Sequence, residues 1–491
     1  MAGSLFRTKS IDSLMAESRA TGEGTLKRTL GPWALIALGI GAIIGAGLFV
    51  RTAAAIADRA GPSVVLAFIV AGIGCAFAGL CYAEFASMIP VAGSAYTYSY
   101  ATMGELLAWI IGWDLVLEYA VGAATVAIAW SEYFNRVLGW FDMRIPYAWT
   151  HSPFERVGGE QGIMNLPAIL ILFLLTMLLI RGTRESAFVN GLIVIVKVSI
   201  VLLVIALGWG FINPANHTPL IPEATTYVTP QGVTHNYGGI MGILGAAGVV
   251  FFAYIGFDAV STAAQEAKNP KRDMPIGILG SLVICTLLYI LFSYVLSGLA
   301  PVADFRNPEL GREASVAYAI TTYMPGYGWL SDAVTVAILA GFSSVILVML
   351  LGQSRVFYSM SNDGLVPKIF SEVHPTYRTP YKSNWLFFFF TAVFAAFVPG
   401  DIVGEMTSIG TLFAFILVCA GVWIMRVRRP DLDRGFTVPA LPLVAVLGIV
   451  TCGAMIYGLG WTNWLRLAGW LAVGMVIYFG YSVNHSKLRN A

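Results

Sequence analysis

The residues of this chain with the most evident capacity for binding are glycines inside an apolar segment. Gly39, Gly41, Gly45 and Gly47 lie within residues 39–49, which with their flanks are long enough to span a bilayer. Glycine costs about 1 kcal/mol relative to alanine in a helix interior. Backbone groups released inside lipid are tolerated only where they are buried in protein or line a cavity. The spacing therefore predicts a helix interrupted at membrane depth, the kind of place where transporters bind substrate.

A second interruption is predicted between residues 238 and 265. There the chain places a glycine, Gly256, and an acidic residue, Asp258, at membrane depth. The first interruption falls in the first predicted span and the second in the sixth. Two breaks five spans apart indicate two five-helix repeats of opposite topology, because after an odd number of crossings the second copy enters from the other face.

Ionisable side chains at bilayer depth cost several kcal/mol, which makes them functional candidates. Lys197 lies well inside the predicted fifth span with no charged neighbour in that helix. Glu118 lies at the midpoint of the third span and shares a helical face with Asp114. Glu118 could pair with a cationic substrate group, accept a proton or satisfy a neighbouring helix. Asp258 is expected to cap the helix that follows Gly256, with direct substrate contact as the alternative.

Further residues are candidates for gates. Glu84, near the inner end of the second span, and Glu266, beside Lys268, are expected to form part of a cytoplasmic gate. Ion pairs there would have to break when the inner side opens; the alternative is a solvated interfacial pair worth under about 1 kcal/mol. Phe252 and Tyr254 could cover the substrate as aromatic lids, and Phe252 is favoured by its position beside the second break.

The elements that position these residues are membrane helices. The chain has 491 residues, of which 57% are hydrophobic and 11% are charged, and its mean hydropathy is +0.76. Soluble proteins usually have about 25% charged residues. We therefore predict a polytopic membrane protein with twelve spans, near residues 32–55, 62–88, 104–131, 163–181, 189–212, 238–265, 276–299, 329–356, 384–399, 402–425, 439–458 and 462–483.

Basic residues predict the orientation. If both termini lie inside, the inner segments hold twenty of the 29 Lys and Arg residues, the outer segments hold eight, and Lys197 lies within a span. Lys and Arg are enriched on the cytoplasmic side, so we expect cytoplasmic termini and a multi-pass protein of the plasma membrane. The expected organisation is a cytoplasmic tail (1–31), a first repeat (32–212), a second repeat (238–425), two further spans (439–483) and a second tail (484–491).

The composition argues against an enzyme. All five cysteines fall inside predicted spans without metal-type spacing, and all five histidines lie in predicted loops or at the C-terminus. We therefore expect no metal, no cofactor and no nucleic acid partner.

Several motifs together resemble one transporter family. Residues Gly41–Phe49 resemble the first-helix signature of the amino acid-polyamine-organocation superfamily. Residues Phe252–Asp258, Gly112–Tyr119 and Arg355–Gly364 resemble segments of its cationic amino acid transporter branch. The resemblance covers nearly the whole chain. It implies an all-α membrane protein with a 5+5 inverted-repeat (LeuT-like) fold, discontinuous first and sixth helices, and two peripheral helices.

The resemblance also implies a substrate site at the two breaks. Amides around the first break would receive the α-carboxylate of an amino acid, and carbonyls of both breaks would receive its ammonium. This agrees with the partial charges at helix ends; the alternative role of the glycines is close helix packing. The residues concerned are Gly45, Ala46 and Gly47 for the carboxylate, and Ile43, Phe252 and Ile255 for the ammonium, with Ala253 in the same break. Glu118 is a candidate for the same pocket because of its charge at bilayer depth and not because of the resemblance, since the cationic branch often has a small polar residue at this position.

A coupling role for Lys197 is also implied. In sodium-coupled relatives a sodium ion lies between the first and eighth helices, and a lysine of the fifth helix can place its ammonium there. Its expected partners are carbonyls near Gly41 and Ala42 and the hydroxyl of Ser343 or Ser344. The hypothesis is proton coupling through Lys197, and the alternative is a fixed structural cation.

Together these features predict a secondary active, proton-coupled transporter that works by alternating access and accepts cationic L-amino acids, within an arginine, lysine, ornithine or alanine class. A broad or neutral amino acid transporter or exchanger is the nearest alternative. A sensor that binds an amino acid without moving it is the alternative from another class. The expected partners are the substrate, protons, membrane lipids and a small single-span membrane subunit.

Overall fold

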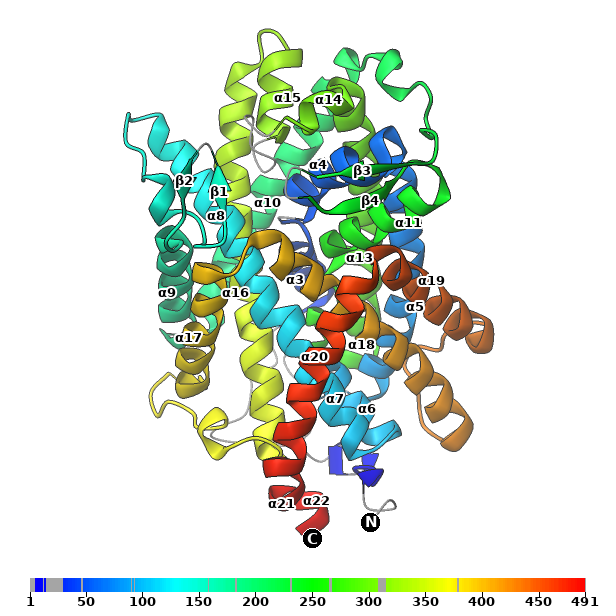
Figure 1. Cartoon of the computed structure of the whole chain (residues 1–491). Helices are drawn as coiled ribbons and strands as arrows, with labels where there is room; N and C mark the ends of the chain where they lie inside the picture. Colours follow the sequence, from blue (N-terminus) through cyan, green and yellow to red (C-terminus); the bar gives the residue numbers. More distant parts are fainter. Residues whose placement is uncertain are drawn as a thin grey trace.

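Long apolar helices make up most of this computed structural model (Figure 1). It describes residues 5–11, 13–14, 30–45, 47–89, 91, 93–157, 159–181, 183–229, 232–264, 267–307, 315–377 and 379–490. The helices of the first half are α3 (Pro32–Ile43), α4 (Thr52–Ala55), α5 (Val64–Met88), α6 (Ser94–Thr102), α7 (Glu105–Val116), α8 (Gly122–Gly139), α9 (Leu166–Arg181) and α10 (Thr183–Gly208). Those of the second half are α11 (Gly239–Val250), α12 (Ala259–Thr262), α13 (Pro270–Leu299), α14 (Val302–Phe305), α15 (Ser315–Tyr323), α16 (Gly328–Asn362), α17 (Tyr381–Phe397), α18 (Gly400–Arg428), α19 (Leu441–Leu459), α20 (Trp461–Ile477), α21 (Val483–His485) and α22 (Lys487–Asn490).

The prediction of an all-α membrane protein is confirmed. Within the described residues, nine helical segments are long and apolar enough to cross a membrane, judged by length and composition. A helix lies at each of the twelve predicted spans, but α3, α9 and α17 have only 12, 16 and 17 residues. The short helices α6 and α15 were not predicted, because neither is long enough to produce a hydropathy signal of its own.

The first helix is interrupted where the glycines predict. Helix α3 ends at Ile43, and Ile44 is extended, with φ −75° and ψ 106°. The chain becomes helical again at Gly47, in a π-helical turn η1 (Gly47–Arg51) that leads into α4 and a second π-helical turn η2 (Ile56–Ala60). The interruption therefore leaves the carbonyl end of α3 without a continuing helix.

The sixth predicted span is interrupted as well. Helix α11 passes into a 3₁₀ turn η8 (Phe251–Tyr254), and Ile255 is extended, with ψ 132°. Gly256 follows with φ +112°, a conformation that residues with a Cβ rarely adopt. The short helix α12 then completes the span.

The two interrupted helices run in opposite directions and meet at their breaks. Helix α11 packs against η2 at one end, and α12 packs against α3 at the other. A Cβ on Gly47 would lie 2.6 Å from the Cβ of Ala253, and a Cβ on Gly256 would lie 2.8 Å from that of Ala42. Glycine is therefore needed on both sides for the backbones to approach this closely.

Two antiparallel hairpins lie between helices, pairing β1 (Arg156–Val157) with β2 (Glu160–Gln161) and β3 (Thr225–Val228) with β4 (Thr234–Tyr237). The second hairpin contacts the part of the first interrupted helix that follows the break. The Arg306 guanidinium lies 4.1 and 4.4 Å from the ring centres of Tyr227 and Tyr237, and its Nε donates to the Ala57 carbonyl at 2.8 Å.

The segments near the two ends of the chain meet at the opposite end of the molecule from β3 and β4 (Figure 1). The Lys9 ammonium pairs with Asp363 at 2.8 Å, and the Lys487 amide donates to the Asp363 carbonyl at 3.0 Å. Glu105, buried at the start of α7, pairs with Arg489 at 2.7 Å. These contacts join both tails to the ends of α7 and α16.

Candidate functional site

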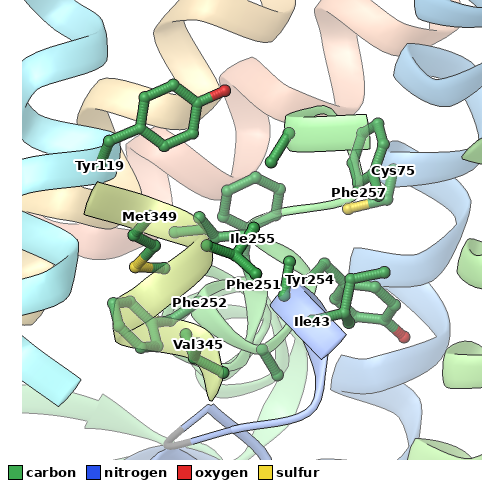
Figure 2. Close-up of a cluster of buried hydrophobic side chains, with 14 of the residues drawn as sticks. Ile43, Cys75, Tyr119, Phe251, Phe252, Tyr254, Ile255, Phe257, Val345 and Met349 are labelled. Carbon is green, nitrogen blue, oxygen red and sulfur yellow. The ribbon is translucent and has the colours of Figure 1, made fainter. Parts of the chain in front are cut away.

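Apolar side chains surround the place where the two breaks meet (Figure 2). Phe252 of η8 lies beside Val345 and Met349 of α16, and Ile43 lies at the end of α3. All four side chains are buried. A Cβ on Gly45 would lie 2.6 Å from Cγ2 of Val345, so α16 covers the first break directly. The predicted backbone site therefore lies inside an apolar enclosure.

A tyrosine that the sequence analysis missed joins the two breaks. The Tyr289 hydroxyl of α13 lies 2.9 Å from the carbonyl oxygens of both Ile43 and Ala253. A hydroxyl carries one proton, so Tyr289 shares it between the two oxygens. The carbonyl of Phe252 accepts the Ile255 amide at 3.4 Å. An ammonium that binds the Ile43 carbonyl would thus compete with the Tyr289 hydroxyl. The sequence gives no signal of this role, because a tyrosine in an apolar span is not unusual.

On the amide side of the site the structure places two of the three expected residues. Gly45 and Gly47 flank the break, and the Gly45 carbonyl accepts the Leu48 amide at 3.2 Å. Ala46 lies outside the described residues.

Lys197 is buried, with 1% of its surface exposed, and its ammonium holds the carbonyl end of α3. It donates to the carbonyl oxygens of Gly41 at 2.7 Å and Ile44 at 2.8 Å. The stem of Lys197 packs against Gly341 of α16, where a Cβ would lie 3.4 Å from Cδ of the lysine, an ordinary van der Waals contact. A cation at the C-terminal end of a helix is favourable.

Two of the partners expected for Lys197 need correction. The second carbonyl belongs to Ile44 rather than Ala42, because Ile44 is extended and its carbonyl oxygen is turned out of the helical hydrogen-bond pattern where α3 ends. Ser344 donates to the Gly41 carbonyl at 3.3 Å and also bonds to Asn190. Ser343 accepts instead from the Trp130 indole at 3.1 Å, since adjacent helical residues point in different directions.

Glu118 and Asp258 form a buried acidic pair. Both are fully buried, and the Tyr119 hydroxyl donates to Oδ2 of Asp258 at 2.6 Å. The Glu118 carboxyl lies next to Asp258 and Thr411, but within the described part of the chain neither Glu118 oxygen has a hydrogen bond of good geometry. Asp258 occupies the N-cap position of α12, yet its side chain makes no capping hydrogen bond there. It is turned towards Tyr119 because the 3₁₀ turn and Gly256 redirect the chain.

The gate candidates separate into different environments. The Tyr254 hydroxyl donates to the Phe68 carbonyl at 2.9 Å, which turns its ring towards α5 and away from Phe252 (Figure 2). Glu84 is not a solvated surface group, because it is 1% exposed. It forms ion pairs with Arg426 and, at 3.3 Å, with Arg434, and it accepts a hydrogen bond from the Val438 amide at 2.8 Å. It ties α5 to the segment after α18. Glu266 lies outside the described residues.

Comparison with known proteins gives consistent matches over most or all of the chain. The family model described as amino acid permease matches residues 30–485. The branched-chain amino acid permease BcaP of Bacillus subtilis is 44% identical over 491 residues, which cover 100% of both chains. The methylthioribose transporter of the same organism is 40% identical over 486 residues, 99% of each chain. Cationic amino acid transporter 9 of Arabidopsis thaliana is 38% identical over 431 residues, 87% of this chain and 71% of that protein.

Proposed function

This chain belongs to the amino acid permease family of the amino acid-polyamine-organocation superfamily, and on that premise we propose that it carries amino acids across a membrane by alternating access. The observation that carries the proposal is the meeting of two antiparallel broken helices at Gly47 and Gly256. Unwound backbone of this kind offers free amides to an anion and free carbonyls to a cation. An amino acid carries one anion, its α-carboxylate, and one cation, its α-ammonium, at a fixed separation.

The full architecture is part of this proposal. We propose twelve crossings, two inverted five-helix repeats at 32–212 and 238–425, and two further spans within 439–483. The opposed directions of the broken helices support the inverted repeat. The excess of Lys and Arg in the segments on the side of the termini supports cytoplasmic tails (1–31 and 484–491) in a plasma membrane protein.

Substrate binding at the breaks uses the backbone. The amides around Gly45, Ala46 and Gly47 receive the α-carboxylate. The carbonyls of Ile43, Phe252 and Ile255 receive the ammonium. Tyr289 then yields its hydrogen bond to Ile43, and its second acceptor, Ala253, keeps the hydroxyl in place.

The side chain of the substrate faces apolar groups. Ile43, Phe252, Val345 and Met349 supply aliphatic, aromatic and thioether surface around the breaks. Burying an apolar side chain against such surface is favourable by about 25 cal/mol per Å². This lining supports a neutral amino acid with an apolar side chain, and the 44% identical relative is named as a branched-chain amino acid permease.

A cationic substrate is the second candidate. It is favoured by Glu118, which is fully buried and whose oxygens lack hydrogen bonds of good geometry within the described residues. A cationic side chain long enough to reach Glu118 would neutralise a carboxylate. A 38% identical relative is named as a cationic amino acid transporter.

Proton coupling is proposed through Lys197. When charged, its ammonium holds two carbonyls at the end of α3. Loss of the proton removes the positive charge and leaves two of the three donor hydrogens. The hydrogen bonds to the two carbonyls are then no longer charge-assisted and become weaker. Because α3 must move for the site to open towards the termini, protonation of Lys197 would be linked to that opening.

Counterflow in proteoliposomes tests the proposal. Vesicles loaded with unlabelled leucine should accumulate labelled leucine transiently, and vesicles loaded with arginine or methylthioribose should not drive this exchange. Exchange with arginine as fast as with leucine would favour the cationic candidate. Equilibrium binding with no counterflow of either amino acid would indicate a sensor, and counterflow of methylthioribose alone would overturn an amino acid substrate.

A further inference from the structure

A guanidinium lies directly above Phe252, on the side of the site away from the termini. Arg51 is the last residue of η1, six residues beyond Gly45. Its Cζ is 5.5 Å from the centre of the Phe252 ring, and the residue is 7% exposed. Arg51 is one of the eight basic residues that the sequence assigns to the outer segments, and its position in the chain does not show which side chain it covers.

Arg51 is held in this position by the start of α18. Its Nη1 pairs with Asp401 at 3.3 Å, and its Nη2 donates to the Gly400 carbonyl at 3.1 Å. A Cβ on Gly404, one helical turn further on, would collide with the guanidinium. The absence of a side chain at Gly404 therefore provides the space that the guanidinium of Arg51 occupies. The guanidinium is fixed by its bonds to Asp401 and Gly400 and by its packing against Gly404.

The carboxylate of Asp401 does not fully cancel the positive charge of Arg51 on the side that faces the protein interior. The Asp401 side chain is 64% exposed, whereas the Arg51 side chain is 9% exposed. Water screens the aspartate more strongly than the buried guanidinium. The pair therefore presents a net positive potential inward, towards Phe252 and the two breaks.

We propose that Arg51 is a specificity-determining residue that keeps cationic side chains out of the site beneath Phe252. This inference rests on the proposed function, because it assumes that Phe252 borders the substrate. A zwitterionic α-amino acid tolerates the guanidinium, since its carboxylate and ammonium compensate each other. The extra charge of arginine or lysine meets uncompensated repulsion. One unit charge roughly 10 Å away at an effective dielectric of about 20 changes binding by about tenfold.

The experiment measures the ratio of arginine to leucine uptake in proteoliposomes under counterflow. Arg51→Gln should raise this ratio about tenfold while leucine counterflow continues. Asp401→Asn, which leaves the guanidinium without its counter-charge, should lower the ratio. The matched control is Arg156→Gln, which removes an exposed arginine of β1 and should leave the ratio unchanged.

The outcomes separate this inference from the proposed function. Active leucine exchange with an unchanged ratio in Arg51→Gln and Asp401→Asn would overturn the charge filter and leave the transporter proposal intact. A wild-type ratio near one would overturn the filter as well. Absence of counterflow for both amino acids in the wild type would overturn both proposals. If Arg51→Gln does not fold, the ratio in Asp401→Asn alone decides, because that side chain is mostly exposed.

Discussion

Replacing Lys197 by methionine should separate proton coupling from substrate exchange. Methionine has a similar length and no charge, so it removes the ammonium and its hydrogen bonds to Gly41 and Ile44 while filling the same space. Each charge-assisted bond is worth about 1.5–3 kcal/mol, which gives a loss of about 3–6 kcal/mol. Removing a buried ammonium also returns several kcal/mol of desolvation cost. The net change in the free energy of unfolding should therefore stay within about 2 kcal/mol.

Transport should respond more strongly than stability. Wild-type proteoliposomes with an inward proton gradient should accumulate leucine above the external concentration. Lys197→Met should lose this accumulation and retain leucine counterflow, because exchange needs the site but no net proton movement. Lys382→Met is the matched control, since Lys382 pairs with Glu372 and is 38% exposed.

Accumulation of leucine by Lys197→Met to the wild-type level under the same gradient would refute proton coupling through Lys197. Lys197 would then be a fixed structural cation whose place an apolar side chain can take. A loss of both accumulation and counterflow in folded protein would show that Lys197 forms the site itself, and would equally contradict a role confined to coupling.

The remaining predictions concern the breaks and one loop. Tyr289→Phe removes the hydroxyl that joins the two breaks and should lower the free energy of unfolding by about 1–3 kcal/mol, measured by thermal unfolding in detergent; an unchanged transition would contradict the shared hydrogen bond. Gly47→Ala places a Cβ 2.6 Å from that of Ala253 and should abolish counterflow, whereas Gly453→Ala, with nothing within 4 Å, should not. Burial lowers the pKa of His217, so the folded protein binds this proton less tightly than the unfolded chain. Stability should fall as pH drops below about 6.5, and a His217→Gln variant with the same pH dependence as the wild type would argue against this group.

The sequence alone was sufficient to predict that this is a membrane protein and to predict where its first and sixth spans are interrupted. Hydropathy is a property of consecutive residues, so a helix lies at each of the predicted spans, although several helices extend beyond the predicted bounds. Glycine acts on its own backbone, so the interruptions after Ile43 and at Gly256 follow from residue type. Lys197 was also evident, because one charge in an apolar helix is conspicuous wherever its side chain points.

Partners across the bundle were decided only by the tertiary structure. Which of Ser343 and Ser344 approaches Gly41 depends on the rotation of α16 about its axis. The bridge from Tyr289 and the placement of Arg51 over Phe252 join residues that are far apart in the chain. A side chain in an apolar helix is compatible with many rotations and neighbours, and the packing of the two broken helices against α13, α16 and α18 selects one.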